Sequence, residues 1–341
     1  MTLADIWFAL VAVLLTGYVV LDGFDLGAGV LYPFVARDEG ERAVVRTSIG
    51  PLWDGNEVWL VAGGGALFAA FPLVYAAVFS GFYLAIMLFL FGLILRAVAL
   101  EFRHRETHAA WKPLWDAAFF LGSLLPAVLL GCAFANLVRG VPLDANGDYA
   151  GRFVDLLNPY ALLVAVTGLS LLVTHGSAWL ELKSGPGALH DRVRRLRRLS
   201  FWAFVALLAA TTAATFSAAP RATDLVLGRA AGWLFLALLA ASLAYTAWAL
   251  HRGGERGAFL GSAATVVALA GLGAVGNYPE MVPARGTPPQ TSLTVASASS
   301  GDTTLAAMLV IAVIGLPLVL LYTAWVYRVF RGKVTTAEAE Y

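Results

Sequence analysis

The sequence predicts an all-α polytopic membrane protein with about nine transmembrane helices. Of its 341 residues, 60% are hydrophobic and only 13% are charged, whereas about a quarter of the residues of a soluble domain carry charge. Apolar windows long enough to cross a bilayer, about 20 residues each, recur along the whole chain. They fall at 5–34, 54–72, 74–101, 114–138, 158–183, 199–218, 226–250, 257–276 and 304–330.

The first window carries Asp5 where a signal peptide would carry positive charge, so we expect it to be retained as a helix. The window 54–72 is the least regular, because it opens with two acids and contains three consecutive glycines, which leaves a re-entrant or buried helix as an alternative. Pro72 separates it from the next window. The connecting loops are short, and we expect residues 1–341 to form a single integral membrane domain.

The basic residues predict the orientation, since Lys and Arg favour the cytoplasmic loops. With the N-terminus outside and nine crossings, 18 of the 23 basic residues fall in cytoplasmic segments. The exceptions are Arg139, Arg152, Arg221, Arg229 and Arg285. Removing one crossing before residue 100 would scramble this asymmetry. We therefore treat 54–72 as a true crossing and expect a cytoplasmic C-terminus.

Two acidic residues open the window 54–72, in the string WDGNEVW at 53–59. An ionisable side chain at bilayer depth costs roughly 2.5–3.5 kcal/mol and usually marks a polar pathway inside the protein. Asp54 and Glu57 are three residues apart, so a helix places both on one face. The alternative is that Asp54 caps the helix, with Glu57 as the returning member of a capping box.

Further acids converge on the predicted cytoplasmic half of the bundle. Asp22 and Asp25 lie three residues apart in LDGFDLGAG, and Glu101 ends the third window. Arg96, five residues before Glu101, is the expected countercharge of these carboxylates. Together these carboxylates predict a route for protons or cations. The alternative is an ion-pair network that only fixes how the helices pack.

Whether the chain could bind a haem can be judged from the axial ligands that its apolar windows offer. Of the five histidines only His175 falls inside a window, and we expect it to be a hydrogen-bonded helix contact and not a haem ligand. Cys132 is the only cysteine and predicts a small core residue. The basic run at 191–200 predicts an anchor on anionic lipid, with a specific partner site as the alternative. We expect no metal and no catalytic residue in this chain.

Four strings resemble subunit II of the cytochrome bd-type terminal quinol oxidases, including the cyanide-insensitive branch. They are LDGFDLGAG at 21–29, IGPLWDGNEVWLVAGGGALFAAFPLVYA at 49–76, FSGFYLAIMLFLFGLILRAVALEFR at 79–103 and LLYTAWVYRVF at 320–330. The resemblance implies nine helices, arranged as two four-helix bundles (about 1–140 and 155–276) plus a peripheral helix (304–330). It also implies pairing with a subunit I that carries the quinol site and three haems, two of type b and one of type d or b. Subunit II of this family carries no haem.

The resemblance also implies roles for single residues. Asp54 would belong to a proton route towards the haems of subunit I, and Glu101 would lie near its mouth. Trp59 and Arg96 match positions associated with an oxygen passage. The segment between the sixth and seventh windows is shorter than in long members, and the VALEFRHRE stretch differs near Glu101, which puts the entrance of the route in doubt. Whether a structural quinone or a small single-helix accessory subunit is present stays open.

The sequence thus predicts a haem-free, non-catalytic subunit of a quinol:oxygen oxidoreductase in a bacterial inner membrane. Asp54, Glu57 and Glu101 would relay protons, while Asp22 and Asp25 orient the first helix. The partners would be subunit I, lipid and quinone, with no nucleic acid. A proton- or cation-coupled transporter is the alternative from another class, since glycine-broken helices and buried acids also bind transported substrates. A third interpretation is an assembly scaffold, in which the acids do not affect turnover.

Overall fold

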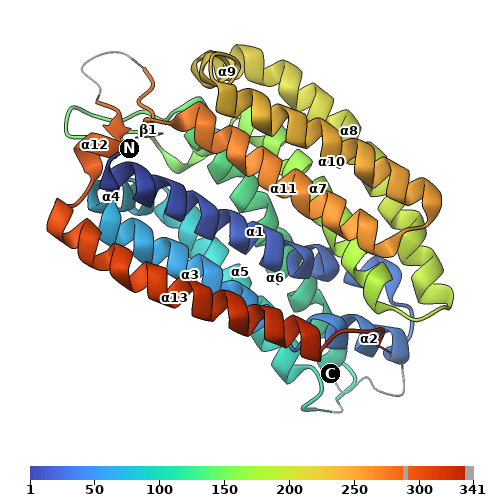
Figure 1. The fold of residues 1–341 in the computed structure, drawn as a ribbon. Helices are drawn as coiled ribbons and strands as arrows, with labels where there is room; N and C mark the ends of the chain where they lie inside the picture. Colours follow the sequence, from blue (N-terminus) through green and yellow to red (C-terminus); the bar gives the residue numbers. More distant parts are fainter. Residues whose placement is uncertain (107, 287–290, 335–341) are drawn as a thin grey trace.

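The computed structural model describes residues 1–106, 108–286 and 291–334 and consists almost entirely of α-helices (Figure 1). The helices are α1 (Leu3–Val35), α2 (Glu39–Ile49), α3 (Trp53–Ala70), α4 (Pro72–Gly81), α5 (Tyr83–Phe102), α6 (Trp111–Arg139), η1 (Phe153–Leu157), α7 (Pro159–Lys183), α8 (Ala188–Ala218), α9 (Pro220–Leu227), α10 (Ala230–Arg252), α11 (Glu255–Asn277), α12 (Val295–Ala298) and α13 (Asp302–Val329). Two short strands, β1 (Glu280–Val282) and β2 (Leu293–Thr294), pair antiparallel in the segment between α11 and α12.

Eight of the described helices are long and apolar enough to cross a membrane: α1, α5, α6, α7, α8, α10, α11 and α13. Helix α3 is not among them, because its first turns carry the acids Asp54 and Glu57. At 18 residues it is about 27 Å long, close to the thickness of the hydrocarbon core. It runs beside α1 in Figure 1. A ninth crossing, the outside N-terminus and the division into two bundles stay predictions.

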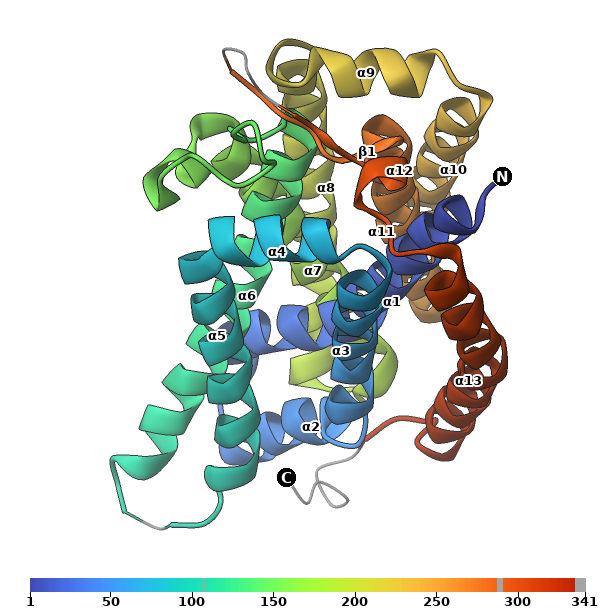
Figure 2. The same ribbon diagram turned by 90° about the vertical axis from the view of Figure 1, so that its left-hand side faces the viewer.

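Two of the predicted windows are each divided between two helices. The window 74–101 breaks at Phe82, so that α4 lies across the end of the molecule while α5 runs through it (Figure 2). The window 226–250 breaks at Gly228, between α9 and α10. Both breaks follow or fall on a glycine, at positions 81 and 228, and glycine is the poorest helix former after proline. Hydropathy alone did not indicate these breaks, because both windows are mainly apolar.

Helix α1 lies at the centre and packs against α3, α6, α7 and α11. Its approach to α7 depends on two glycines, as is common where membrane helices cross closely. A Cβ added to Gly27 would lie 2.0 Å from the carbonyl oxygen of Leu172, and one added to Gly176 would lie 2.5 Å from the backbone of Gly27. The backbones of α1 and α7 are therefore in direct contact. This contact fixes the position of Asp22 and Asp25 along the axis of the bundle.

We predict that Gly27→Ala destabilises the protein, because the new methyl group must push α7 away from α1. Overpacking of this kind costs about 1–3 kcal/mol or more. Gly315→Ala, in α13, is the matched control, since a Cβ there meets nothing within 4 Å. The melting temperature of the purified complex should fall for Gly27→Ala and stay unchanged for Gly315→Ala. Equal melting temperatures for the two variants would show that the crossing tolerates a side chain.

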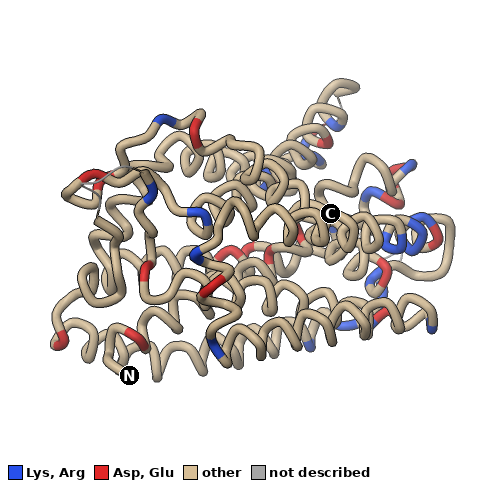
Figure 3. Tube along the Cα trace, turned by 90° about the horizontal axis from the view of Figure 1, so that it is seen from above, with Lys and Arg blue, Asp and Glu red and all other residues tan. Residues whose placement is uncertain are grey.

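Charged side chains gather at the end of the molecule that contains α2, which we call the α2 end (Figure 3). This amphipathic helix was not foreseen by the sequence. Arg103 is buried there and pairs with Glu39 at 3.0 Å and with Asp116 at 2.5 Å. The basic run 191–200 belongs to α8, and part of it turns inward: Arg197 is fully buried, and Arg192 pairs with Glu41. The run is therefore not only a surface anchor.

The pairing at the α2 end predicts a pH dependence. Hydrogen bonds from Arg103 lower the pKa of Glu39 from its ordinary value of 4.5 to about 2. A lowered folded-state pKa contributes stability above the unfolded value, and this contribution is lost as the pH falls through that window towards about 2. Because Glu39 is 55% exposed, we expect at most about 1 kcal/mol. The melting temperature of the wild type should exceed that of Glu39→Gln at about pH 6, and the difference should be clearly smaller at about pH 3, inside the window in which the contribution is lost. An equal difference at the two pH values would contradict the pairing.

Candidate functional site

A fully buried arginine holds together three helices near the middle of the molecule. Arg96 of α5 donates from Nη2 to Asp22 Oδ1 of α1 at 2.6 Å and to Glu57 Oε1 of α3 at 2.5 Å. The side chains of Arg96 and Asp22 are 0% exposed. Buried charges are tolerated only when they are paired in this way. The sequence prediction that Asp22, Glu57 and Arg96 are polar groups inside the bundle agrees with this placement.

A chain of hydrogen bonds extends this group towards α13. Tyr327 donates its hydroxyl to Asn56 Oδ1 at 3.0 Å, and Asn56 Nδ2 donates to Asp25 Oδ2 at 2.7 Å. The second Asn56 N–H bonds the carbonyl oxygen of Leu21 at 3.1 Å. Asp25 is fully buried and lies one helical turn from Asp22, as the three-residue spacing predicts. We call Asp22, Asp25, Asn56, Glu57 and Arg96 the polar cluster.

The acids of α3 differ in exposure. The side chain of Glu57 is 22% exposed, so it is the carboxylate through which the polar cluster reaches the surface of the chain. Asp54 lies on the outward face of α3 and is exposed. The capping interpretation of these two residues is wrong, because the N-cap of α3 is Leu52 and makes no side-chain capping bond. Neither acid therefore caps α3.

Arg96 is the countercharge of Asp22 and Glu57 and does not face Glu101. Five residues along a helix turn a side chain to a different face, so Glu101 cannot share the inward direction of Arg96. Glu101 is only half-buried near the end of α5, and Arg96 is occupied by Asp22 and Glu57. The structure thus brings Asp22, Asp25 and Glu57 together and leaves Glu101 outside the polar cluster.

Trp59 borders the polar cluster and is 7% exposed. Its ring lies over Gly17, where a Cβ would come within 2.3 Å of Trp59 Cε3, and it packs with Leu14 and Tyr18. Glycine at position 17 makes room for the ring. Trp59 therefore fills the space between α1 and α3 and packs beside Tyr18.

Sequence reasoning missed three members of the site: Tyr18, Asn56 as a hydrogen-bonding link, and Tyr327. Asn56 stands inside the string WDGNEVW, where its amide among the apolar residues was the available signal. Tyr18 lies one turn before Asp22 on α1. Tyr327 lies 271 residues from its partner, and no local pattern could have indicated the contact.

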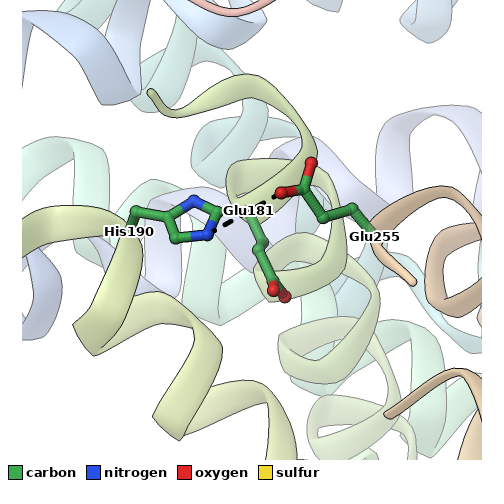
Figure 4. A group of neighbouring side chains, drawn as sticks. All are labelled: Glu181, His190 and Glu255. Carbon is green, nitrogen blue, oxygen red and sulfur yellow. Dashed lines mark ion pairs between the residues drawn. The ribbon is translucent and has the colours of Figure 1, made fainter. Parts of the chain in front are cut away.

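Two other polar groups in the helices are accounted for by their neighbours. Both ring nitrogens of His175 are hydrogen-bonded, Nδ1 to Ser262 Oγ at 2.8 Å and Nε2 to the carbonyl oxygen of Val20 at 2.9 Å. This agrees with a helix contact. The other group lies at the α2 end. It consists of a histidine and two glutamates whose side-chain nitrogen and oxygen atoms lie within 4.8 Å of one another. They are Glu181, His190 and Glu255 (Figure 4).

The charge around this second group favours ion pairing over a metal. Lys333 Nζ bonds both carboxylate oxygens of Glu255, at 2.8 and 2.9 Å. Arg197 lies 2.5 Å from the carboxylate of Glu181, with Arg194 at 3.8 Å. Two carboxylates already face three cations, so a divalent ion would add positive charge where an excess exists.

The fold and the polar cluster define a class: an all-α, multi-pass membrane protein with ionisable groups in its interior. The sequence model of the family "Cytochrome bd terminal oxidase subunit II" matches residues 3–330. The chain belongs to this family. It is therefore a subunit of a terminal oxidase, an oxidoreductase complex of the bacterial inner membrane, and the transporter alternative is not favoured.

Relatives of the chain match over its full length. It is 37% identical to a "Probable cytochrome oxidase subunit 2" of Haemophilus influenzae, covering 96% of this chain and 94% of that protein. It is 34% identical to the "Cytochrome bd-I ubiquinol oxidase subunit 2" of Escherichia coli (98% and 96%) and 37% identical to the "Cytochrome bd ubiquinol oxidase subunit 2" of Bacillus subtilis (99% and 98%). The fold is similar to a chain of the bd oxidase from Geobacillus thermodenitrificans, with a TM-score of 0.80, 18% identity, and coverage of 97% and 99%.

Proposed function

We propose that this chain is the haem-free subunit of a quinol:oxygen oxidoreductase and that its polar cluster supplies protons for the reduction of O2 to water. The haems and the quinol site would lie on the partner, subunit I. The observation that carries the proposal is the pairing of Arg96 with Asp22 and Glu57 in the middle of a membrane protein. Buried carboxylates at this depth are expensive and usually serve a pathway.

The polar cluster has the composition of a proton store. It contains three carboxyl groups and one guanidinium, so in its fully ionised form it carries an excess of negative charge that proton uptake reduces. Several buried polar atoms of the polar cluster and of the neighbouring Tyr18 have no hydrogen-bond partner within the described residues. They are Tyr18 Oη, Asp22 Oδ2, Asp25 Oδ1, Arg96 Nε and Arg96 Nη1. Buried polar atoms of this kind are the usual partners of internal water, which would connect the carboxylates into a relay.

The outward face of α3 is where this route would meet subunit I. Asp54 shares that face with large apolar side chains that are strongly exposed, Val61 at 73% and Phe68 at 59%. The neighbouring face of α5 is similar, with Tyr83 and Phe91 exposed. A partner helix packed on this face would cover Asp54, which lies one helical turn before Glu57 on α3, and would shield both carboxyl groups from lipid. In this arrangement Asp54 passes protons between the polar cluster and subunit I, and Trp59 borders the oxygen passage.

Replacing Glu57 by glutamine tests the proposal. Glutamine keeps the shape and can accept the bond from Arg96, but it cannot release a proton as an acid does. We expect quinol-dependent oxygen consumption to fall by about tenfold or more, which corresponds to about 1.4 kcal/mol of barrier, with the haem content of the complex unchanged. The matched control is Glu106→Gln, on an exposed loop. Full turnover in Glu57→Gln would leave the polar cluster with a structural task only.

Glu101, a quinone or lipid bound within this chain, and a small accessory subunit stay predictions of the resemblance. Of these, Glu101 is the most open to test, because it is half-buried near the α2 end and outside the polar cluster. If it lies at the mouth of the route, Glu101→Gln lowers oxygen consumption less than Glu57→Gln does, since solvent protons can reach Glu57 by its exposed edge.

A further inference from the structure

Helix α13 contributes a hydroxyl to the polar cluster although it is barely packed. Leu305 is its only buried residue within the described part of the chain. Its other end carries Tyr327, which donates to Asn56 Oδ1. Figure 2 shows α13 standing apart from the other helices along much of its length. A helix held so loosely needs a further tie if Tyr327 is to keep its hydrogen bond.

The residues that follow α13 supply such a tie. Lys333 Nζ donates to both carboxylate oxygens of Glu255, at 2.8 and 2.9 Å, and to the carbonyl oxygen of Ser184 at 3.0 Å. The backbone N–H of Val334 donates to the carbonyl oxygen of Lys183 at 2.7 Å, and Lys183 Nζ in turn donates to the carbonyl oxygen of Phe330. The segment 330–334 is thus bonded to the end of α7 and the start of α11.

Each partner is suited to its position. The last carbonyl groups of a helix have no partner within the helix and carry partial negative charge, which favours an ammonium group there. Lys333 meets the end of α7 in this way, and Glu255 in the first turn of α11 supplies its countercharge. Glu255 also lies 3.7 Å from His190 and beside Glu181 (Figure 4). Within this group of Glu181, His190 and Glu255, the carboxylate of Glu255 therefore serves to bind the ammonium group of Lys333.

We propose that Lys333 is a positioning residue: its bonds to Glu255 and to the end of α7 hold the end of α13 in place, so that Tyr327 stays hydrogen-bonded to Asn56. The inference rests on the proposed function of the polar cluster. Tyr327 lies in the last turn of α13 and Lys333 lies four residues beyond its end, so a shift of the tie moves the hydroxyl directly. The segment 330–334 then acts on proton supply without contacting the carboxylates of the polar cluster.

The test uses the intact complex with four variants: Lys333→Ala, Lys333→Arg, Tyr327→Phe and the double variant Lys333→Ala/Tyr327→Phe. Arg331→Ala is the matched control, since it also removes one exposed cation from the same segment. Hydrogen exchange of the Phe330 and Val334 amides reports the tie directly. Oxygen consumption as a function of pH reports the polar cluster, and haem content reports assembly.

We expect both amides to exchange at least about tenfold faster in Lys333→Ala and at the wild-type rate in Lys333→Arg and Arg331→Ala. The pH profile of Lys333→Ala should match that of Tyr327→Phe, and the double variant should show no further change, because both remove the same contact. Unchanged exchange in Lys333→Ala, or losses that multiply in the double variant, would overturn the inference. If the proton route itself is wrong, Glu57→Gln and Tyr327→Phe both keep full turnover while the exchange still rises, so the two failures are distinguishable.

Discussion

Replacing Arg96 by glutamine is expected to prevent the oxidase complex from accumulating in the membrane. The substitution leaves Asp22 and Glu57 facing each other inside the bundle without a cation. Removing one partner of a buried ion pair costs about 3–5 kcal/mol, a large part of the stability of a typical fold. The amount of complex and the haem it retains should both fall strongly. Arg105→Gln, on an exposed loop, is the control and should assemble normally.

A second substitution separates the charge from the shape. In the double variant Asp22→Asn/Arg96→Gln the two groups can still hydrogen-bond, and one of the two unpaired carboxylates is gone. We expect it to assemble better than Arg96→Gln alone, because the cost of the single change is mostly an uncompensated charge. If the double variant assembles no better, the guanidinium is needed for its packing and not for its charge.

Replacing Asp25 by asparagine is expected to lower turnover strongly without disturbing the fold. Asp25 accepts a hydrogen bond from Asn56 and forms no ion pair with any described residue, and the side-chain amide oxygen of asparagine can still accept the Asn56 N–H. We expect oxygen consumption to fall by about tenfold or more at normal haem content. Asp191→Asn, on an exposed face of α8, is the control. Loss of haem in Asp25→Asn would show that the residue only orients α1, as one of the sequence predictions holds.

Much of the fold is readable from composition. The predicted windows for α1, α6 and α7 agree with the observed helices to within a few residues, whereas α8 begins at Ala188, well before the window at 199–218. The division of two windows could not be predicted, because an apolar residue such as Phe82 fits the middle of a helix as well as a break. Helix α2 was missed for a different reason: it carries many charges and lies outside the apolar windows, so hydropathy does not report it.

The candidate site was predictable only in part. Spacing placed Asp22 and Asp25 in the same part of the bundle, because three residues make nearly one helical turn. It did not separate Asp54, which faces outward, from Glu57, which contacts Arg96. Which acids Arg96 contacts depends on how three helices are rotated against one another, and no local pattern reports that. Tyr327 and Lys333 were out of reach, since their partners lie on distant helices.

The most direct test of the account is proton uptake from the cytoplasmic side during oxygen reduction. The complex is reconstituted into vesicles with its α2 end facing a compartment that holds a pH-sensitive dye, and a single turnover is started with O2. If the polar cluster supplies the protons, we expect Glu57→Gln to slow proton uptake and oxygen reduction together, by about tenfold or more. Glu106→Gln should behave as the wild type. Proton uptake at the wild-type rate in Glu57→Gln would contradict this role of the polar cluster.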